Sequence, residues 1–126
     1  MSTDVFEIEV IKNLKSLQLV FDLLRERVGS PVSYKSIADD VAISPTTVKK
    51  YIQILESLYI IFIVTPFSNN IARSLLKEPK IYIFDNCLVT ASAGARLENL
   101  VANGLLKSIY ARNDYLAQEN ASPIKI

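Results

Sequence analysis

The chain contains no histidine in 126 residues, and Cys87 is its single cysteine. Without histidine, catalytic arrangements that use an imidazole base are excluded, and so are the usual zinc sites built from several histidines and cysteines. One cysteine cannot form a disulfide within the chain. These absences leave few enzyme classes and favour a reduced, cytoplasmic protein.

Glycine is also scarce, with three in the whole chain, and no G-x-x-x-x-G-K-[ST] phosphate loop is present. We therefore expect no ATP hydrolysis by these residues. No apolar run is long enough to span a membrane, and the N-terminus does not resemble a signal sequence. The net charge is +1, so any contact with nucleic acid must come from a local patch.

Residues 33–60 have the pattern of a helix-turn-helix, in which two short helices are joined by a tight turn. Ser33 is placed to cap the first helix, whose apolar spacing indicates a core face. Ser44 is placed to cap the second helix, and Pro45 suits its first position because proline has no N–H to satisfy there. The core face of the first helix is predicted to be Ile37, Ala38 and Val41.

The second helix of such a unit usually meets a DNA groove or a partner protein. Its apolar stripe is predicted to be Val48, Tyr51, Ile52, Leu55, Leu58 and Tyr59. Its outward face supplies candidate DNA-binding residues, namely Thr46, Thr47, Lys49, Lys50 and Gln53. Charges of opposite sign cancel across the helix-turn-helix, so an ordinary solvated face is the alternative interpretation.

Residues 3–28 show helical spacing of apolar side chains and predict one long helix or two stacked ones. Gly29 and Pro31 are expected to end it, because glycine accepts a left-handed C-cap and proline cannot continue a helix. This segment would complete a three-helix core. Its expected core residues are Phe6, Val10, Leu14, Leu17, Phe21, Leu24 and Val28.

Two short runs rich in β-branched and aromatic residues, 60–64 and 80–84, predict strands that pair antiparallel. The long loop between them contains Arg73 and Lys77, which are candidates for contact with a phosphate backbone. Two strands behind a helix-turn-helix make a winged helix. We therefore expect a mainly α chain with a small β-hairpin, in which residues 1–85 form a winged-helix domain with a long N-terminal helix.

Several short motifs follow one another at the spacings of a known family. They are Thr47-Val48 with Tyr51, Leu55 and Glu56, then Pro66-Phe67 and Asn70, then Lys77-x-Pro79-Lys80-x-Tyr82-x-Phe84-Asp85, and finally Gly94-x-x-x-Glu98-Asn99-x-Val101. On these motifs, residues 4–110 resemble the C-terminal region of bacterial and archaeal AAA-type ATPases. The resemblance implies an ATPase module upstream of this piece. It also implies that residues 86–126 begin a restriction-endonuclease-like domain, as a β/α fragment with one helix and a strand. Asp85-Asn86-Cys87-Leu88 departs from the Asp-x-Gly-Leu of that family.

An endonuclease-like site would need a helix carboxylate, a further acidic residue and a Glu-x-Lys on neighbouring strands. Glu98 on an expected helix from Gly94 to about Ala111 could supply the first element, but the rest is incomplete, and a solvated or capping carboxylate is the favoured interpretation. We expect no metal site and no cofactor. The apolar stripe of this helix, which needs cover and predicts self-association, is Leu97, Leu100, Val101, Leu105 and Ile109. Residues 115–126 are expected to form a loop that leads into a strand.

Five other side chains are expected to have structural rather than functional roles. Tyr34, Tyr51 and Tyr59 lie at core spacing and are expected to pack inside. Asp85 follows a strand and suits a turn or cap, and Cys87 is expected to be an inert, half-buried thiol because no second cysteine or histidine can activate it.

Two hypotheses of function follow. The first is a winged-helix module that binds double-stranded DNA with residues 46–50 in the major groove and Arg73 or Lys77 on phosphates. The second is a protein-interaction module that couples the ATPase and C-terminal pieces or mediates oligomerisation. In both, the chain has no catalytic activity of its own.

Overall fold

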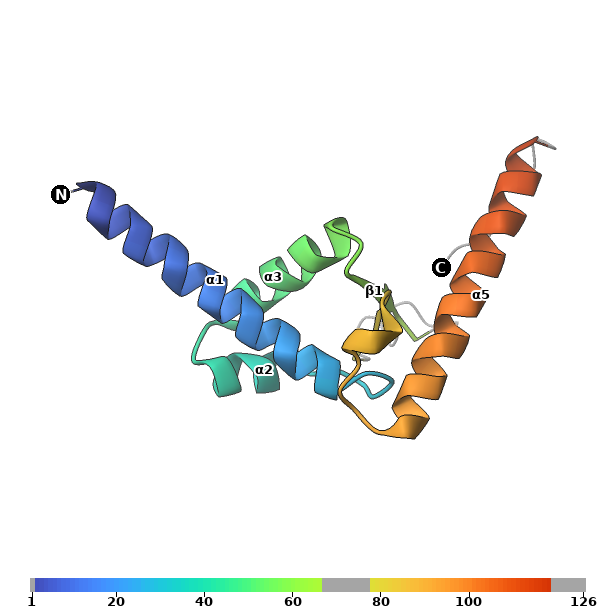
Figure 1. The fold of residues 1–126 in the computed structure, drawn as a ribbon, viewed down its shortest axis with the longest axis horizontal. Helices are drawn as coiled ribbons and strands as arrows, with labels where there is room; N and C mark the ends of the chain where they lie inside the picture. Colours follow the sequence, from blue (N-terminus) through green and yellow to red (C-terminus); the bar gives the residue numbers. More distant parts are fainter. Residues whose placement is uncertain (1, 67–77, 119–126) are drawn as a thin grey trace.

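The computed structural model describes residues 2–66 and 78–118 and shows a mainly helical chain with one small antiparallel sheet (Figure 1). This confirms the expected combination of helices with a β-hairpin. The elements are α1 (Ser2–Glu26), α2 (Tyr34–Val41), α3 (Pro45–Ser57), β1 (Ile61–Val64), β2 (Lys80–Ile83), the short 3-10 helix η1 (Asn86–Leu88) and α5 (Ala93–Gln118).

The N-terminal segment is one continuous helix rather than two stacked ones. Only the C-terminal half of α1 packs into the core, where Val20 and Leu24 are buried. Phe6, Val10 and Leu14, which share the same helical stripe, are 68 %, 40 % and 59 % exposed. The prediction that they lie in the core is wrong, because α1 has 25 residues and the short helices α2 and α3 cover only part of its length (Figure 1).

The turn between α2 and α3 is three residues long and is closed by backbone hydrogen bonds. Ser33 caps α2 by accepting a hydrogen bond from the backbone N–H of Ser36 at 3.2 Å. Ala42 ends α2 in the left-handed conformation with φ of 62°, and the N–H of Ile43 donates back to the carbonyl of Ala38 at 3.0 Å. The bond from Ile43 satisfies the carbonyl of Ala38 near the end of α2, and the left-handed Ala42 lets α3 leave in a new direction.

The sheet pairs β1 with β2 in a register that runs from Ile61 opposite Ile83 to Val64 opposite Lys80. Its other edge is touched by the segment between α1 and α2, because Pro31 forms a bridge with Lys80. The N–H of Val32 also donates to the carbonyl of Pro79 at 2.8 Å. The chain just after α1 therefore runs beside β2 on the side away from β1.

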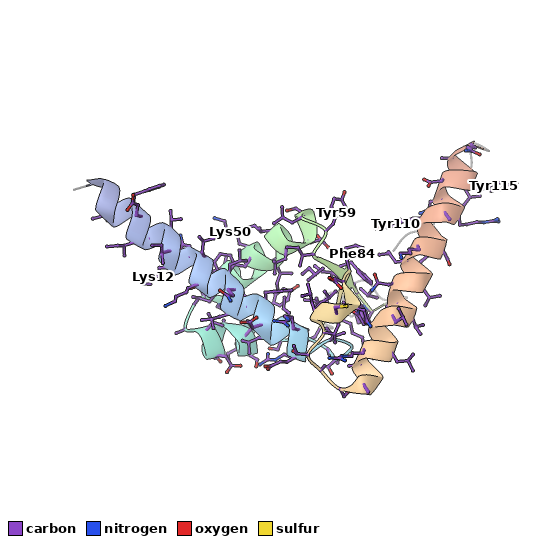
Figure 2. All side chains as sticks on the ribbon, viewed as in Figure 1. Lys12, Lys50, Tyr59, Phe84, Tyr110 and Tyr115 are labelled. Atoms are coloured by element: carbon purple, nitrogen blue, oxygen red, sulfur yellow. The ribbon has the colours of Figure 1, made fainter. Side chains whose placement is uncertain are left out.

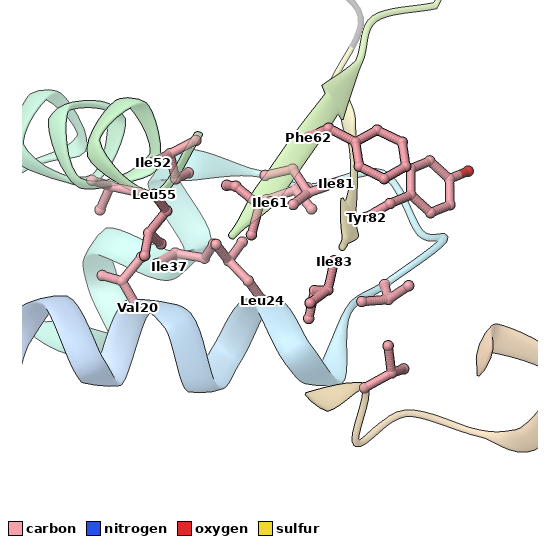
Figure 3. Close-up of a cluster of buried hydrophobic side chains, with 14 of the residues drawn as sticks. Val20, Leu24, Ile37, Ile52, Leu55, Ile61, Phe62, Ile81, Tyr82 and Ile83 are labelled. Atoms are coloured by element: carbon pink, nitrogen blue, oxygen red, sulfur yellow. The ribbon is translucent and has the colours of Figure 1, made fainter. Parts of the chain in front are cut away.

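One apolar core joins the three N-terminal helices to the sheet (Figure 3). It combines buried side chains from every one of these elements. Its central members are Val20, Leu24, Ile37, Ile52, Leu55, Ile61, Ile81 and Ile83. Because α3 contributes its apolar stripe to this core, its opposite face is turned outward.

The end of α3 differs from the expectation. Leu58 and Tyr59 are 61 % and 75 % exposed, although both were expected on the apolar stripe. The helix ends at Ser57, and Tyr59 takes a left-handed conformation with φ of 58° while the N–H of Ile60 bonds to the carbonyl of Leu55. This left-handed turn directs the chain into β1 and moves both side chains off the stripe.

Helix α5 is longer than expected and buries a different face. Tyr115 and the residues up to Gln118 continue the helix rather than forming a loop, since no proline or glycine interrupts this stretch. The residues buried on α5 are Asn99, Asn103 and Leu106. The apolar stripe that contains Leu97, Leu100, Val101 and Leu105 stays exposed. The strand expected near the C-terminus falls in residues 119–126, outside the described part.

Candidate nucleic-acid interface

The outward face of α3 carries four of the candidate residues as exposed side chains: Thr46, Lys49, Lys50 and Gln53. They alternate with the buried Val48, Ile52 and Leu55, so the same helix supplies core packing on one side and a polar surface on the other. Figure 2 shows Lys50 at the outer surface of the molecule near the beginning of α3. The structure thus brings these four side chains onto one face.

Thr47 belongs to the cap of α3 rather than to the open surface. Its backbone N–H donates to Ser44 Oγ at 3.1 Å, and its hydroxyl lies 2.7 Å from the same Oγ. The side chain is half-buried. A contact from Thr47 to an outside molecule would therefore compete with the bond that fixes the start of the helix.

The two lysines of this face form no ion pair within residues 2–66 and 78–118. On α2, the charge of Asp40 is paired with the guanidinium of Arg27, from which Asp40 accepts a hydrogen bond at 2.7 Å. Burial, and secondarily the charge of Glu56, raises the pKa of Tyr34 above its ordinary value. The positive charge on the outward face of α3 is therefore supplied by Lys49 and Lys50.

Arg73 and Lys77, the candidates for phosphate contact, lie outside the described residues. The described part of the hairpin ends on one side after Pro66 and resumes at Glu78. The contribution of this loop to an interface stays a prediction.

Glu98 is held in an anchoring contact between α5 and the rest of the fold. Tyr82 donates its hydroxyl to Glu98 Oε1 at 3.1 Å, and Lys80 Nζ lies 3.6 Å from the same oxygen. Burial, then the hydrogen bond and charge of Glu98, raise the pKa of Tyr82. Across the described part of the chain, no group of three or more Cys, Asp or Glu side chains could hold a metal ion.

The loop after β2 contains Asp85, which acts as a cap as expected. Its Oδ1 accepts from the backbone N–H of Cys87 at 3.0 Å and starts the short helix η1. Cys87 itself is exposed rather than half-buried, because the tight turn of η1 directs it to the surface.

Asn99 and Asn103 attach α5 to the sheet, a role that the spacing of apolar residues did not predict. Asn99 accepts from the N–H of Ile83 and donates to the carbonyl of Ile83, both at 2.8 Å. Asn103 donates to the same carbonyl at 3.0 Å. Two asparagines four residues apart, on the same face of the helix as the apolar Leu106, are the signal that could have indicated this contact.

Two hollows lie between the hairpin and α5. One of about 300 Å³ is lined by Glu56 and the aromatic side chains of Tyr59, Phe84 and Tyr110, which Figure 2 labels. The other, of about 310 Å³, is lined almost wholly by apolar side chains, including Phe62. Neither brings several polar groups together as small-molecule sites do.

A comparison with protein families finds a match over residues 1–99 to the family described as Domain of unknown function (DUF8612). The chain belongs to this family. The DUF8612 match runs from α1 through the candidate face on α3 and ends at Asn99, within the first turns of α5. No curated protein and no solved structure matches the chain.

The DUF8612 description assigns no activity, so the expected ATPase module and endonuclease-like segment stay predictions. Among the described residues, no helix of this DUF8612 chain combines the length and apolar character needed to cross a membrane.

Proposed function

We propose that this DUF8612 chain is a winged helix-turn-helix module that binds double-stranded DNA through α3. The observation that carries the proposal is the polar outer face of α3, where Thr46, Lys49, Lys50 and Gln53 are exposed. Both lysines are available for phosphates, because neither is paired within the described residues. Threonine and glutamine are side chains that can contact base edges or the sugar-phosphate backbone.

The order of the elements supports this proposal. A helix, a short bridging segment at Pro31, two helices joined by a tight turn, and then two antiparallel strands follow one another as in winged-helix domains. In helix-turn-helix proteins the second helix places its N-terminal residues in the major groove. Residues 46–53 occupy that part of α3.

The small number of cations limits the expected affinity. If Lys49 and Lys50 each neutralise one phosphate of duplex DNA, the logarithm of the binding constant should fall with the logarithm of salt concentration with a slope of about −2. Each lysine or arginine supplied by the loop between β1 and β2 would make the slope steeper by about 1. Binding is therefore expected to be weak and salt-dependent.

The test measures the fluorescence anisotropy of a labelled DNA duplex at low salt with the full chain. A double variant, Lys49→Glu with Lys50→Glu, is expected to weaken binding by tenfold or more, since two phosphate contacts become repulsive. The matched control, Lys12→Glu with Lys15→Glu, makes the same charge change on exposed positions of α1 and should have a much smaller effect. Equal losses from the two double variants would show that α3 is not the binding surface.

The second candidate function is a protein-interaction module, with an upstream ATPase module as the partner that the resemblance predicts. The specific observation that favours it is the set of large apolar side chains exposed on α1 and α5, such as Phe6 and Leu97. Absence of any DNA binding by the unmodified chain at low salt would contradict the first candidate and leave this one.

A further inference from the structure

The hollow of about 300 Å³ beside the end of α3 has walls made of aromatic rings. Tyr59, Phe84 and Tyr110, which Figure 2 labels, come from three different parts of the chain and line it together. The rings of Tyr59 and Phe84 have centroids 6.3 Å apart and planes inclined by 64°, so they form two walls of a corner. Phe62 adds another ring, whose centroid is 5.1 Å from that of Phe84. Aromatic side chains that are distant in the sequence therefore converge on one hollow.

Tyr59 has a backbone conformation that is unusual for tyrosine. Its φ of 58° lies in the left-handed region, and the turn is closed by bonds from the N–H of Tyr59 and of Ile60 to carbonyls in the last turn of α3. Glycine usually occupies this position after a helix, because it has no Cβ to strain. The side chain of Tyr59 is 75 % exposed, so its burial offsets little of that strain. Strained residues cluster at binding sites, and this turn holds an exposed ring against Phe84.

The α3 side of the hollow is negatively charged. Glu56 lines the hollow and forms no ion pair within the described part of the chain. The end of α3 lies here too, and the dipole of a helix leaves about half a negative charge at its C-terminus. The cations of the same helix, Lys49 and Lys50, precede Glu56 by seven and six residues, or about two turns. Asp85, directly after Phe84, adds a further exposed carboxylate.

Charges on α5 do not reverse this balance. Lys107 lies three residues before Tyr110 and Asp114 four residues after it, so both share its side of the helix and their charges cancel. Arg112 follows Tyr110 by two residues, which places it toward the opposite side of α5, and its guanidinium lies 5.7 Å or less from a different ring, that of Tyr115, at 5.5 Å. The surroundings of the hollow are therefore acidic and favour a cation.

No cationic side chain among residues 2–66 and 78–118 lines the hollow. The hollow lies at the end of the hairpin where Ile61 pairs with Ile83, whereas the link between the strands leaves from the opposite end. The cations outside the described residues are Arg73, Lys77 and Lys125. Each of them is a competing occupant that a substitution can test.

We propose that this hollow binds a methylated ammonium group, the cation of choline and of trimethyllysine. A quaternary nitrogen has no N–H to donate, so it requires aromatic faces and negative charge rather than several hydrogen-bonding groups. Its nearly spherical shape fits a corner formed by two inclined rings, whereas a planar guanidinium stacks on one ring. The volume of about 300 Å³ is at the lower end of the range for small-molecule pockets. This inference does not depend on DNA binding by α3.

The test titrates the full chain with choline and follows the resonance of the choline methyl protons by NMR. Binding should shift this resonance upfield in a saturable way, because methyl groups that lie over aromatic faces are shielded by the ring currents. The uncharged isostere dimethylbutanol, in which carbon replaces the nitrogen, should bind about tenfold more weakly, since it loses the attraction to the rings and to Glu56. A trimethyllysine peptide distinguishes the two sources of the group: it should bind more tightly than choline if the natural ligand is a protein side chain, and more weakly if it is a free small molecule.

Substitutions locate the binding site. Tyr59→Gly removes one wall and also relieves the left-handed backbone, so the variant should stay folded while its affinity for choline falls about two- to fivefold. Glu56→Gln keeps the size of the side chain and should lower the affinity by a similar factor, because the charge is lost. The controls Tyr115→Ala and Glu26→Gln remove an exposed ring and an exposed carboxylate elsewhere and should leave the affinity unchanged.

Three results would overturn the proposal. The first is the absence of a saturable upfield shift, or an equal affinity for choline and dimethylbutanol. The second is unchanged choline binding in Tyr59→Gly, or tighter binding of guanidinium than of choline. The third is an affinity for choline that rises about tenfold in Arg73→Gln, Lys77→Gln or Lys125→Gln, which would show that a cation of this chain fills the hollow.

Discussion

Replacing Asn99 by alanine tests how α5 is attached to the sheet. Asn99 is completely buried, and its side-chain amide pairs with both backbone groups of Ile83. The N–H of Phe84 bonds to the carbonyl of Ile60, directly before β1, so by the alternation of an antiparallel ladder the backbone groups of Ile83 point away from β1. The amide of Asn99 thus takes the place of a missing strand at this edge.

The magnitude follows from the bonds that the substitution removes. The buried N–H of Ile83 would lose its acceptor, which costs about 1–3 kcal/mol. The contact from Asn99 to Asn86 Oδ1 at 3.1 Å would also be lost, at about 1 kcal/mol. The carbonyl of Ile83 keeps a donor, because Asn103 bonds to it. We therefore expect Asn99→Ala to lower the free energy of unfolding by about 2–4 kcal/mol.

The assay is urea unfolding followed by circular dichroism, at one fixed protein concentration so that association does not alter the comparison. The matched control is Asn103→Ala, which removes the same side chain one helical turn away. It should cost only about 1 kcal/mol, since the Ile83 carbonyl retains its bond from Asn99. Equal losses for the two variants, or a loss below about 0.5 kcal/mol for Asn99→Ala, would refute the reasoning, because surface substitutions alone reach that size.

Four further substitutions have expected outcomes. Gly29→Ala should lower the free energy of unfolding by about 1–3 kcal/mol, because φ is +82° and a Cβ would collide with the Glu98 carboxylate. Gly104→Ala, in open space on α5, should raise the free energy of unfolding by up to about 1 kcal/mol. A melting experiment that ranks the two variants in the reverse order would be inconsistent with this structure. Ser44→Ala should cost about 1 kcal/mol in urea unfolding, since the cap of α3 loses its acceptor, and no change would show that the cap contributes nothing. Because the pKa of Tyr82 is raised above its ordinary value of 10.0, the folded state holds this proton more tightly, and stability should fall as the pH rises above about 10. In Tyr82→Phe, unfolding measured between pH 9 and 11 should show a smaller alkaline loss.

Local sequence patterns correctly predicted the elements whose formation depends on interactions between residues a few positions apart. The Ser-Pro pair at 44–45 predicted the start of α3, and the cap geometry confirms it. The β-branched runs around Ile61 and Ile81 predicted two strands, which pair antiparallel as expected. Such signals succeed because caps, proline and alternating side chains act over a few residues.

The stripes on the long helices show where the pattern was not sufficient. Val20 and Phe6 lie in the same periodic segment of α1, yet Val20 is buried and Phe6 is 68 % exposed. Helical spacing shows which side chains share a face, but it does not show how far a neighbouring element extends along that face. For α5 the pattern indicated an apolar face, whereas the sheet edge takes the asparagine face because Ile83 needs hydrogen-bonding partners.

The amino-acid sequence by itself determined the helical character, the tight corner before Pro45, the hairpin and the polar outer face of α3. Each of these depends on backbone preferences and on the spacing of neighbouring residues. The tertiary structure alone decided which apolar stripes are covered, because that depends on the lengths of elements distant in the chain. It also decided that Asn99 holds α5 against β2, since an unpaired backbone group at a sheet edge becomes apparent only when the strands are assembled.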